Sequence, residues 1–201
     1  MIPSNLESKK KRVVFQDIED KRGKRFSDYQ DEFEYLISAG IVLDVNAISN
    51  PAFPLAQSVG KNLLKLYLND VGLLTDVLYG SNIRAVLDDE TGINLGSVYE
   101  SVVAQELAAH GHKLFYYDNR NKGEVDYLID DYDSLSAVPI EVKSGKDYTV
   151  HSALNNFVKN EDYHVKKAYV LSNAREITTN GKITYLPIYD VMFLGDTGNW
   201  R

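Results

Sequence analysis

The stretch Gly123-Glu124-Val125-Asp126-Tyr127-Leu128-Ile129, followed by Val138-Pro139-Ile140-Glu141-Val142-Lys143, decides how this chain is interpreted. It has the pattern of two short apolar strands. Asp126 interrupts the first strand, and Glu141 and Lys143 interrupt the second. Charged groups are unfavourable in buried strands unless they are paired with an opposite charge or bound to a metal. The stretch therefore predicts a functional or structural cluster of charges inside a sheet.

The alternation of a β-strand predicts how these charges are arranged. Successive side chains of a strand point to opposite faces, so Glu141 and Lys143 share one face while Ile140 and Val142 share the other. Asp126 on the neighbouring strand can lie beside Glu141. We therefore expect the two carboxylates and the lysine to be close together.

A fourth charged residue, Glu100, is expected on a helix that precedes these strands. Val103, Ala104 and Leu107 follow it at intervals of three, four and seven residues. That spacing places Glu100 on the same stripe as the apolar residues that would pack against the sheet. A glutamate on a buried stripe needs a partner, which places Glu100 near the other charges.

These four residues predict a divalent metal site. Glu100, Asp126 and Glu141 would supply oxygen ligands, which Mg²⁺ and Mn²⁺ prefer. Asp126, Glu141 and Lys143 would be the catalytic groups, with Lys143 orienting a water molecule or neutralising charge on a phosphoryl group. A buried ion cluster, in which Lys143 pairs with Glu100 or Glu141 and no metal binds, explains the same pattern equally well.

The second part of the chain has the pattern of an α/β (α+β) domain. Its elements follow the order α-β-β-β-α-β, so helices would cover both faces of a mixed sheet. The expected helices span 95–110 and 150–159, and the expected strands span 113–117, 124–129, 138–143, 167–171 and 183–186.

The first part of the chain has the pattern of a winged helix. Apolar residues recur at helical spacing before Gly40, residues 41–45 and 61–68 have the pattern of strands, and Asp70 is placed to cap a short helix. We place the boundary between the two parts in the polar region around residues 80–92. The predicted domains are therefore a winged-helix-like domain over 1–85 and a second domain over 86–201.

Composition restricts the class of protein. The chain has 201 residues, a net charge of −7 and no cysteine, so thiolate chemistry and disulfides are excluded. No apolar run is long enough to span a membrane, and a reducing, cytoplasmic setting is expected. The acidic balance argues mildly against a dedicated nucleic-acid binder. The first thirty residues, however, have more lysine and arginine than acid, so this segment either contacts phosphate or is a solvated end.

Glu100, Asp126 and Glu141-Val142-Lys143 together resemble the PD-(D/E)XK motif of restriction-endonuclease-like nucleases. The wider sequence is similar to the C-terminal domain of unknown function found in prokaryotic predicted AAA-type ATPases. The stretches that carry this similarity are Ile2–Ser4, Leu36–Val42, Lys65–Leu74, Tyr99–Leu107, Glu124–Tyr127 and Ile140–Lys143.

The resemblance implies an N-terminal P-loop ATPase domain, a winged-helix-like region and a nuclease-like end. The motif G-x-x-x-x-G-K-[ST] does not occur in this sequence, so we expect the ATPase domain to be absent and this chain to be the C-terminal part of a longer protein.

Three functions follow as hypotheses. The first is a Mg²⁺- or Mn²⁺-dependent nuclease acting on nucleic acid. The second is a non-catalytic nuclease-like module that binds a protein partner or nucleic acid under control of the ATPase domain. The third is a module that only mediates oligomerisation of its parent protein. Fold alone does not decide among them.

Overall fold

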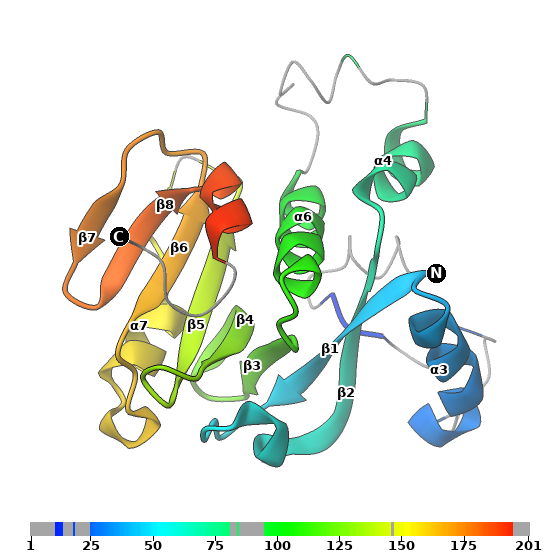
Figure 1. The fold of residues 1–201 in the computed structure, drawn as a ribbon, viewed down its shortest axis with the longest axis horizontal. Helices are drawn as coiled ribbons and strands as arrows, with labels where there is room; N and C mark the ends of the chain where they lie inside the picture. The colour runs from blue at the N-terminus through cyan, green and yellow to red at the C-terminus, as the bar shows by residue number, and fades with distance from the viewer. Residues whose placement is uncertain are drawn as a thin grey trace.

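A mixed sheet of eight strands runs through the part of the chain that the structure describes (Figure 1). The structure is a computed structural model and describes residues 11–13, 18, 25–80, 84, 95–145 and 147–194. The strand order across the sheet is β2-β1-β3-β4-β5-β6-β8-β7. These strands are β1 (Val42–Ile48), β2 (Val59–Leu68), β3 (Phe115–Asn119), β4 (Gly123–Asp131), β5 (Ser136–Lys143), β6 (Ala168–Ser172), β7 (Thr178–Asn180) and β8 (Ile183–Pro187).

The helices follow the order expected from the sequence. They are α3 (Gln30–Ser38), α4 (Val71–Tyr79), α6 (Gly96–Ala109) and α7 (Ser152–Lys159), with short 3₁₀ segments η1 (Phe26–Asp28), η2 (Leu55–Ser58), η3 (Glu161–Tyr163) and η4 (Ile188–Phe193). The predicted sequence α6-β3-β4-β5-α7-β6 is present, and each of these elements lies within a few residues of its expected bounds.

The centre of the sheet is an antiparallel meander followed by a crossover. β3 pairs with β4 and β4 with β5 in antiparallel fashion, and α7 then connects β5 to the parallel strand β6. β8 is parallel to β6, and the short strand β7, which the sequence did not predict, is antiparallel to β8. The prediction of a mixed sheet is thus confirmed.

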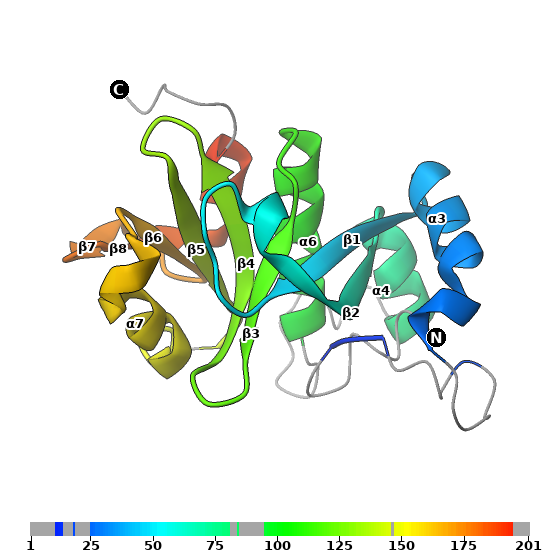
Figure 2. The same cartoon turned by 90° about the horizontal axis from the view of Figure 1, so that it is seen from below.

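Helices cover both faces of this sheet (Figures 1 and 2). The α6 helix packs on one face in a core that includes Val45, Tyr127 and Ile140. The α7 helix packs on the other face in a core that includes Phe115 and Leu128. Burial of these apolar side chains is the main favourable contribution to folding.

The strands of the first part extend the sheet of the second. β1 pairs with β2 in antiparallel fashion and with β3 in parallel fashion, through the register Asn46–Phe115, Ala47–Tyr116 and Ile48–Tyr117. The winged-helix arrangement predicted for 1–85 is not confirmed, because its two strands lie in the sheet with β3–β8. The predicted boundary between residues 85 and 86 lies outside the described residues.

The two faces of β2 contact different helices. Leu64 and Leu66 pack with Phe33 of α3 in a third apolar cluster. The alternate residue Tyr67 belongs to the core beneath α6, and Lys65 lies beside it over the ring of Tyr116. This alternation brings side chains from β2 to the same face of the sheet as α6.

Candidate functional site

The candidate site lies where β4 and β5 separate. The two strands pair from Asp131–Ser136 to Tyr127–Ile140, and beyond that point β5 pairs with β6. The Asp126 carboxylate reaches across this opening, and its Oδ2 accepts a hydrogen bond of 2.8 Å from the backbone N–H of Val142. A side chain thus links the two strands where their ladder ends.

A β-bulge in β4 sets the position of Asp126. Phe115 pairs with Leu128 and Tyr117 with Val125, so Asp126 and Tyr127 together stand opposite the single residue Tyr116. A bulge of this kind bends the strand and redirects the side chains at its position.

Three carboxylates influence one another at this point. The pKa of the Asp126 carboxyl is well above its ordinary value because the group is buried and because Glu141 and Glu100 are like charges nearby. Lys65 and the hydrogen bond from Val142 partly offset this effect. Burial also raises the pKa of Glu141, although Lys143 opposes the shift.

Glu141 and Lys143 form an ion pair on one face of β5. The Lys143 Nζ lies 2.8 Å from Glu141 Oε1, and 30% of the Lys143 side chain is exposed against 9% for Glu141. Burial lowers the pKa of Lys143, but Glu141, Asp126 and Glu100 outweigh burial and raise it, which keeps the ammonium charged. The second oxygen of Glu141, Oε2, is buried and has no hydrogen-bond partner among the described residues.

Glu100 approaches from α6, on the buried stripe that the sequence predicted. Val103, Ala104 and Leu107 are fully buried beside it. Tyr67 of β2 donates a 3.0 Å hydrogen bond to Glu100 Oε2, and Lys11 forms an ion pair with Oε1.

Two lysines that the sequence analysis did not identify complete the cluster. Lys65 of β2 is fully buried, and its Nζ lies 2.6 Å from Glu124 Oε1 and 4.6 Å from the centre of the Tyr116 ring. Lys11 reaches Glu100 from the N-terminal segment. The signal for Lys65 was the one that identified Asp126, namely a charged residue between apolar residues of a strand.

The structure therefore places Asp126 within the electrostatic influence of both Glu100 and Glu141, and it pairs Lys143 with Glu141. Among the described residues, no three histidine, aspartate or glutamate side chains are arranged to hold a metal ion, so the three carboxylates do not form a ready set of ligands. Their fit to a cation instead depends on the unpartnered Oε2 of Glu141 and on the mutual repulsion of the carboxylates. Both favour an added positive charge.

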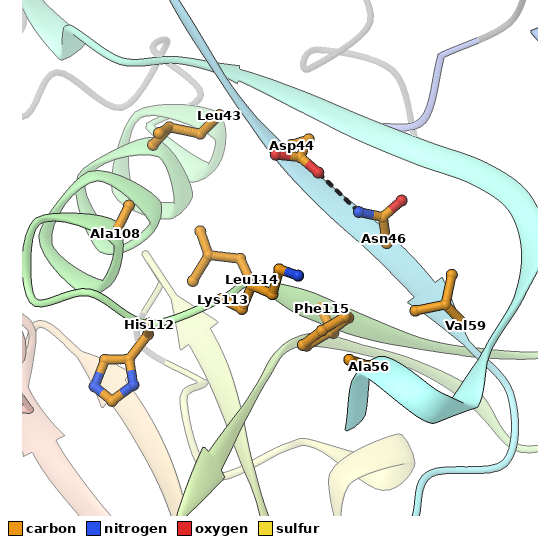
Figure 3. Close-up of a pocket in the computed structure, with 10 residues that line it drawn as sticks. All are labelled: Leu43, Asp44, Asn46, Ala56, Val59, Ala108, His112, Lys113, Leu114 and Phe115. Carbon is orange, nitrogen blue, oxygen red and sulfur yellow. Dashed lines mark hydrogen bonds between the residues drawn. The ribbon is translucent and has the colours of Figure 1, made fainter. Parts of the chain in front are cut away.

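A separate cavity of about 310 Å³ lies between β1, the start of β3 and the end of α6 (Figure 3). Asp44 and Asn46 line it and are joined by a 2.8 Å hydrogen bond, and His112 stands on another side. None of the four predicted site residues lines this cavity. In the described part of the chain, no helix has the length and apolar character needed to cross a membrane.

Comparison with known proteins gives one match. Residues 95–191, just under half of the chain, match the family described as "Domain of unknown function (DUF4143)". No curated protein and no solved structure matches the chain. The matched segment contains all four predicted site residues, whereas Lys11 and Lys65 lie before it. The comparison thus assigns the core of the candidate site to a segment similar to a domain of unknown function.

Proposed function

We propose that this chain is a nuclease-like module that hydrolyses phosphodiester bonds of nucleic acid with the help of Mg²⁺ or Mn²⁺. It would act as the C-terminal module of a larger ATPase-type protein. The observation that carries the proposal is the position of Asp126 at the separation of β4 and β5, where the charges of Glu100 and Glu141 both act on it and Lys143 pairs with Glu141.

The connectivity of the sheet supports the proposal. A helix, a three-stranded antiparallel meander, a second helix and a parallel strand follow one another in α6-β3-β4-β5-α7-β6. The same order underlies the restriction-endonuclease-like resemblance noted from the sequence. The candidate residues lie on α6, β4 and β5, as that resemblance implies.

The residues present are suited to a hard divalent cation. Glu100, Asp126 and Glu141 offer carboxylate oxygens, which such ions prefer over nitrogen and sulfur ligands, and the three side chains would have to move closer together to hold one ion. When bound, the cation would supply positive charge against a phosphoryl group and lower the pKa of a water ligand. Glu100 would exchange its ion pair with Lys11 for this role.

Lys143 would act beside the carboxylates. Its ammonium is kept charged by Glu141 and remains 30% exposed, so it can meet a phosphate from solvent. It would neutralise charge on the phosphoryl oxygens as the bond to the leaving oxygen breaks. Glu141 fixes the position of Lys143 through their 2.8 Å contact.

Calorimetric titration with Mn²⁺ and a plasmid-nicking assay test the proposal together. We expect Mn²⁺ binding by the wild-type chain and at least a ten-fold loss of affinity in Asp126→Asn, because one anionic ligand is removed. Lys143→Ala should retain Mn²⁺ binding but lose about 100-fold in nicking rate, the scale of a lost charge-stabilising group.

Asp133→Asn is a matched control, since Asp133 is an exposed acid in the loop between β4 and β5. It should bind Mn²⁺ and nick plasmid as the wild type does. Absence of any Mn²⁺ binding by the wild-type chain, or equal binding by Asp126→Asn, would contradict the proposal.

A second candidate is a non-catalytic module that binds a protein partner or nucleic acid under control of the ATPase domain. The pairing of Lys11 with Glu100 and of Lys143 with Glu141 favours it, because these lysines already compensate two of the carboxylates. This candidate predicts nucleic-acid or protein binding that Lys143→Ala leaves unchanged, with no nicking under any metal.

A further inference from the structure

A second cavity, of about 570 Å³, lies between α7 and the β7–β8 hairpin. Eleven described residues line it, and none of them is acidic, although the chain as a whole has a net charge of −7. Lys159 and Lys182 both line the cavity, and neither forms an ion pair with another described residue. An acidic protein thus has a cavity whose charged lining is entirely positive, which favours an anionic ligand.

One wall of this cavity is aromatic. Tyr185 lies between two other rings, with its centroid 6.0 Å from that of Tyr148 and 5.6 Å from that of His151. His151 and Tyr185 are buried, and His151 Nε2 is 2.8 Å from the Tyr185 hydroxyl. The Tyr148 ring meets Tyr185 edge to face, at an interplanar angle of 67°, and it is the half-buried member of the three. Tyr148 held in this way offers a ring face on which a planar group can stack.

Amide, hydroxyl and imidazole groups complete the lining. Asn155 of α7 and Asn180 of β7 bring amides, which can donate and accept hydrogen bonds. Thr149 and Thr178 bring hydroxyl groups. His151 adds Nδ1, which is buried and has no hydrogen-bond partner among the described residues. A ligand with both an anionic group and hydrogen-bonding edges would match this set.

We propose that the cavity between α7 and the β7–β8 hairpin binds a nucleoside phosphate, with Lys159 and Lys182 against the phosphate and the Tyr148 ring against the base. The ligand is either a free mononucleotide or one nucleotide of a nucleic-acid strand. The binding site itself does not depend on catalysis at the carboxylates.

Calorimetric titration of the full chain in EDTA tests this inference without any contribution from a divalent metal. The probes are AMP, inorganic phosphate and a twelve-nucleotide single-stranded DNA. We expect Lys159→Ala and Lys182→Ala each to weaken binding about ten-fold, as expected for one lost charge-assisted hydrogen bond. Tyr148→Ala should weaken AMP or DNA binding similarly, because it removes a stacking ring.

Lys166→Ala is the matched control, because Lys166 is exposed and does not line the cavity. Binding of AMP with the expected losses supports a free nucleotide as ligand. Binding of DNA but not AMP, with the same losses of affinity in the cavity variants, supports a nucleotide within a strand.

The inference is overturned if neither AMP nor the DNA binds, or if the cavity variants bind them as tightly as the wild type and Lys166→Ala do. It is also overturned if inorganic phosphate binds as tightly as AMP and Tyr148→Ala changes nothing. Asp126→Asn should leave AMP binding in EDTA unchanged, so failure of the nuclease proposal and failure of this inference give different results.

Discussion

At the scale of single residues, Asp126 combines a favourable hydrogen bond with an unfavourable charge. Its Oδ2 accepts from Val142 N–H, while burial and the charges of Glu141 and Glu100 raise its pKa well above the ordinary value. A carboxyl whose surroundings disfavour its charged form is more typical of a functional site than of one optimised for stability.

Asp126→Asn is therefore expected to stabilise the metal-free protein. A carboxyl whose pKa is raised on folding contributes stability at acidic pH, and this contribution is lost as pH rises through the folded-state pKa. The amide keeps the acceptor for Val142 N–H and removes the charge. A gain of about 1 kcal/mol would raise Tm by roughly 2–4 °C, measured by thermal denaturation in EDTA. The difference from wild type should be largest above neutral pH and smallest near pH 4.

Asp131, also on β4, is a control because its pKa is shifted in the opposite direction. Burial raises its pKa, but hydrogen bonds from Ser134 and Lys167 outweigh burial and lower it overall. Asp131→Asn should therefore lower Tm at neutral pH, with the difference vanishing as pH falls. If both variants shift Tm in the same direction, the electrostatic explanation of Asp126 fails.

Lys65 and Glu124 are expected to be coupled energetically. The lysine is fully buried and its Nζ is 2.6 Å from a Glu124 oxygen, so Glu124→Gln leaves an ammonium with weaker compensation. We expect Glu124→Gln and Lys65→Met each to cost about 2 kcal/mol, less than for a fully buried pair because Glu124 is partly exposed. Urea denaturation of both single variants and the double variant measures the free energy of unfolding of each. A double variant equal to the sum of the two would show that the pair is not coupled.

The same residues show what the sequence could and could not predict. Asp126, Glu141 and Lys143 were identifiable because each interrupts an apolar strand, and Glu100 because it shares the apolar stripe of a helix. Lys65 also interrupts an apolar strand, but its partner Glu124, like the partner Glu100 of Lys11, lies far away in the chain. Spacing along one element contains no information about which distant element will lie against it.

At the scale of elements, local patterns predicted most helices and strands but not how they pair. The expected helix over 95–110 and strands over 124–129 and 138–143 match α6, β4 and β5 closely. The pairing of β1 with β3 was missed because backbone hydrogen bonds between parallel strands leave no mark on hydrophobic periodicity. The three exposed residues of β7 lack the apolar pattern of a strand, so that strand was missed too.

The Asp70 cap of α4 was predicted from sequence and is confirmed. Asp70 Oδ1 accepts hydrogen bonds from the N–H groups of Gly72, at 2.7 Å, and Leu73, at 3.4 Å. Asp70→Ala is expected to destabilise the protein by about 1 kcal/mol, measured by urea denaturation. Asp76→Ala, on the exposed side of the same helix, should change stability by less than half as much. Equal effects would mean that capping does not account for the loss.

At the scale of the whole molecule, the candidate site draws on both halves of the chain. The carboxylates come from α6, β4 and β5, whereas Tyr67 and Lys65 come from β2 and reach Glu100 and Glu124 across the sheet. Between them, β1 pairs in parallel with β3 and continues the sheet. The segment that matches the known family is therefore covered and partly neutralised by residues outside it.

A fragment of residues 95–201 is accordingly expected to fold poorly compared with the full chain. Without β1 and β2, strand β3 would become an unprotected edge and the buried ring of Tyr116 would lose its contact with Lys65. Gel filtration should show association of the fragment, and thermal denaturation should show a broad transition, against a single cooperative transition for the full chain. A monomeric fragment with a sharp transition would instead show that residues 95–201 form an autonomous domain, with β1 and β2 contributing only Lys65 and Tyr67 to its site.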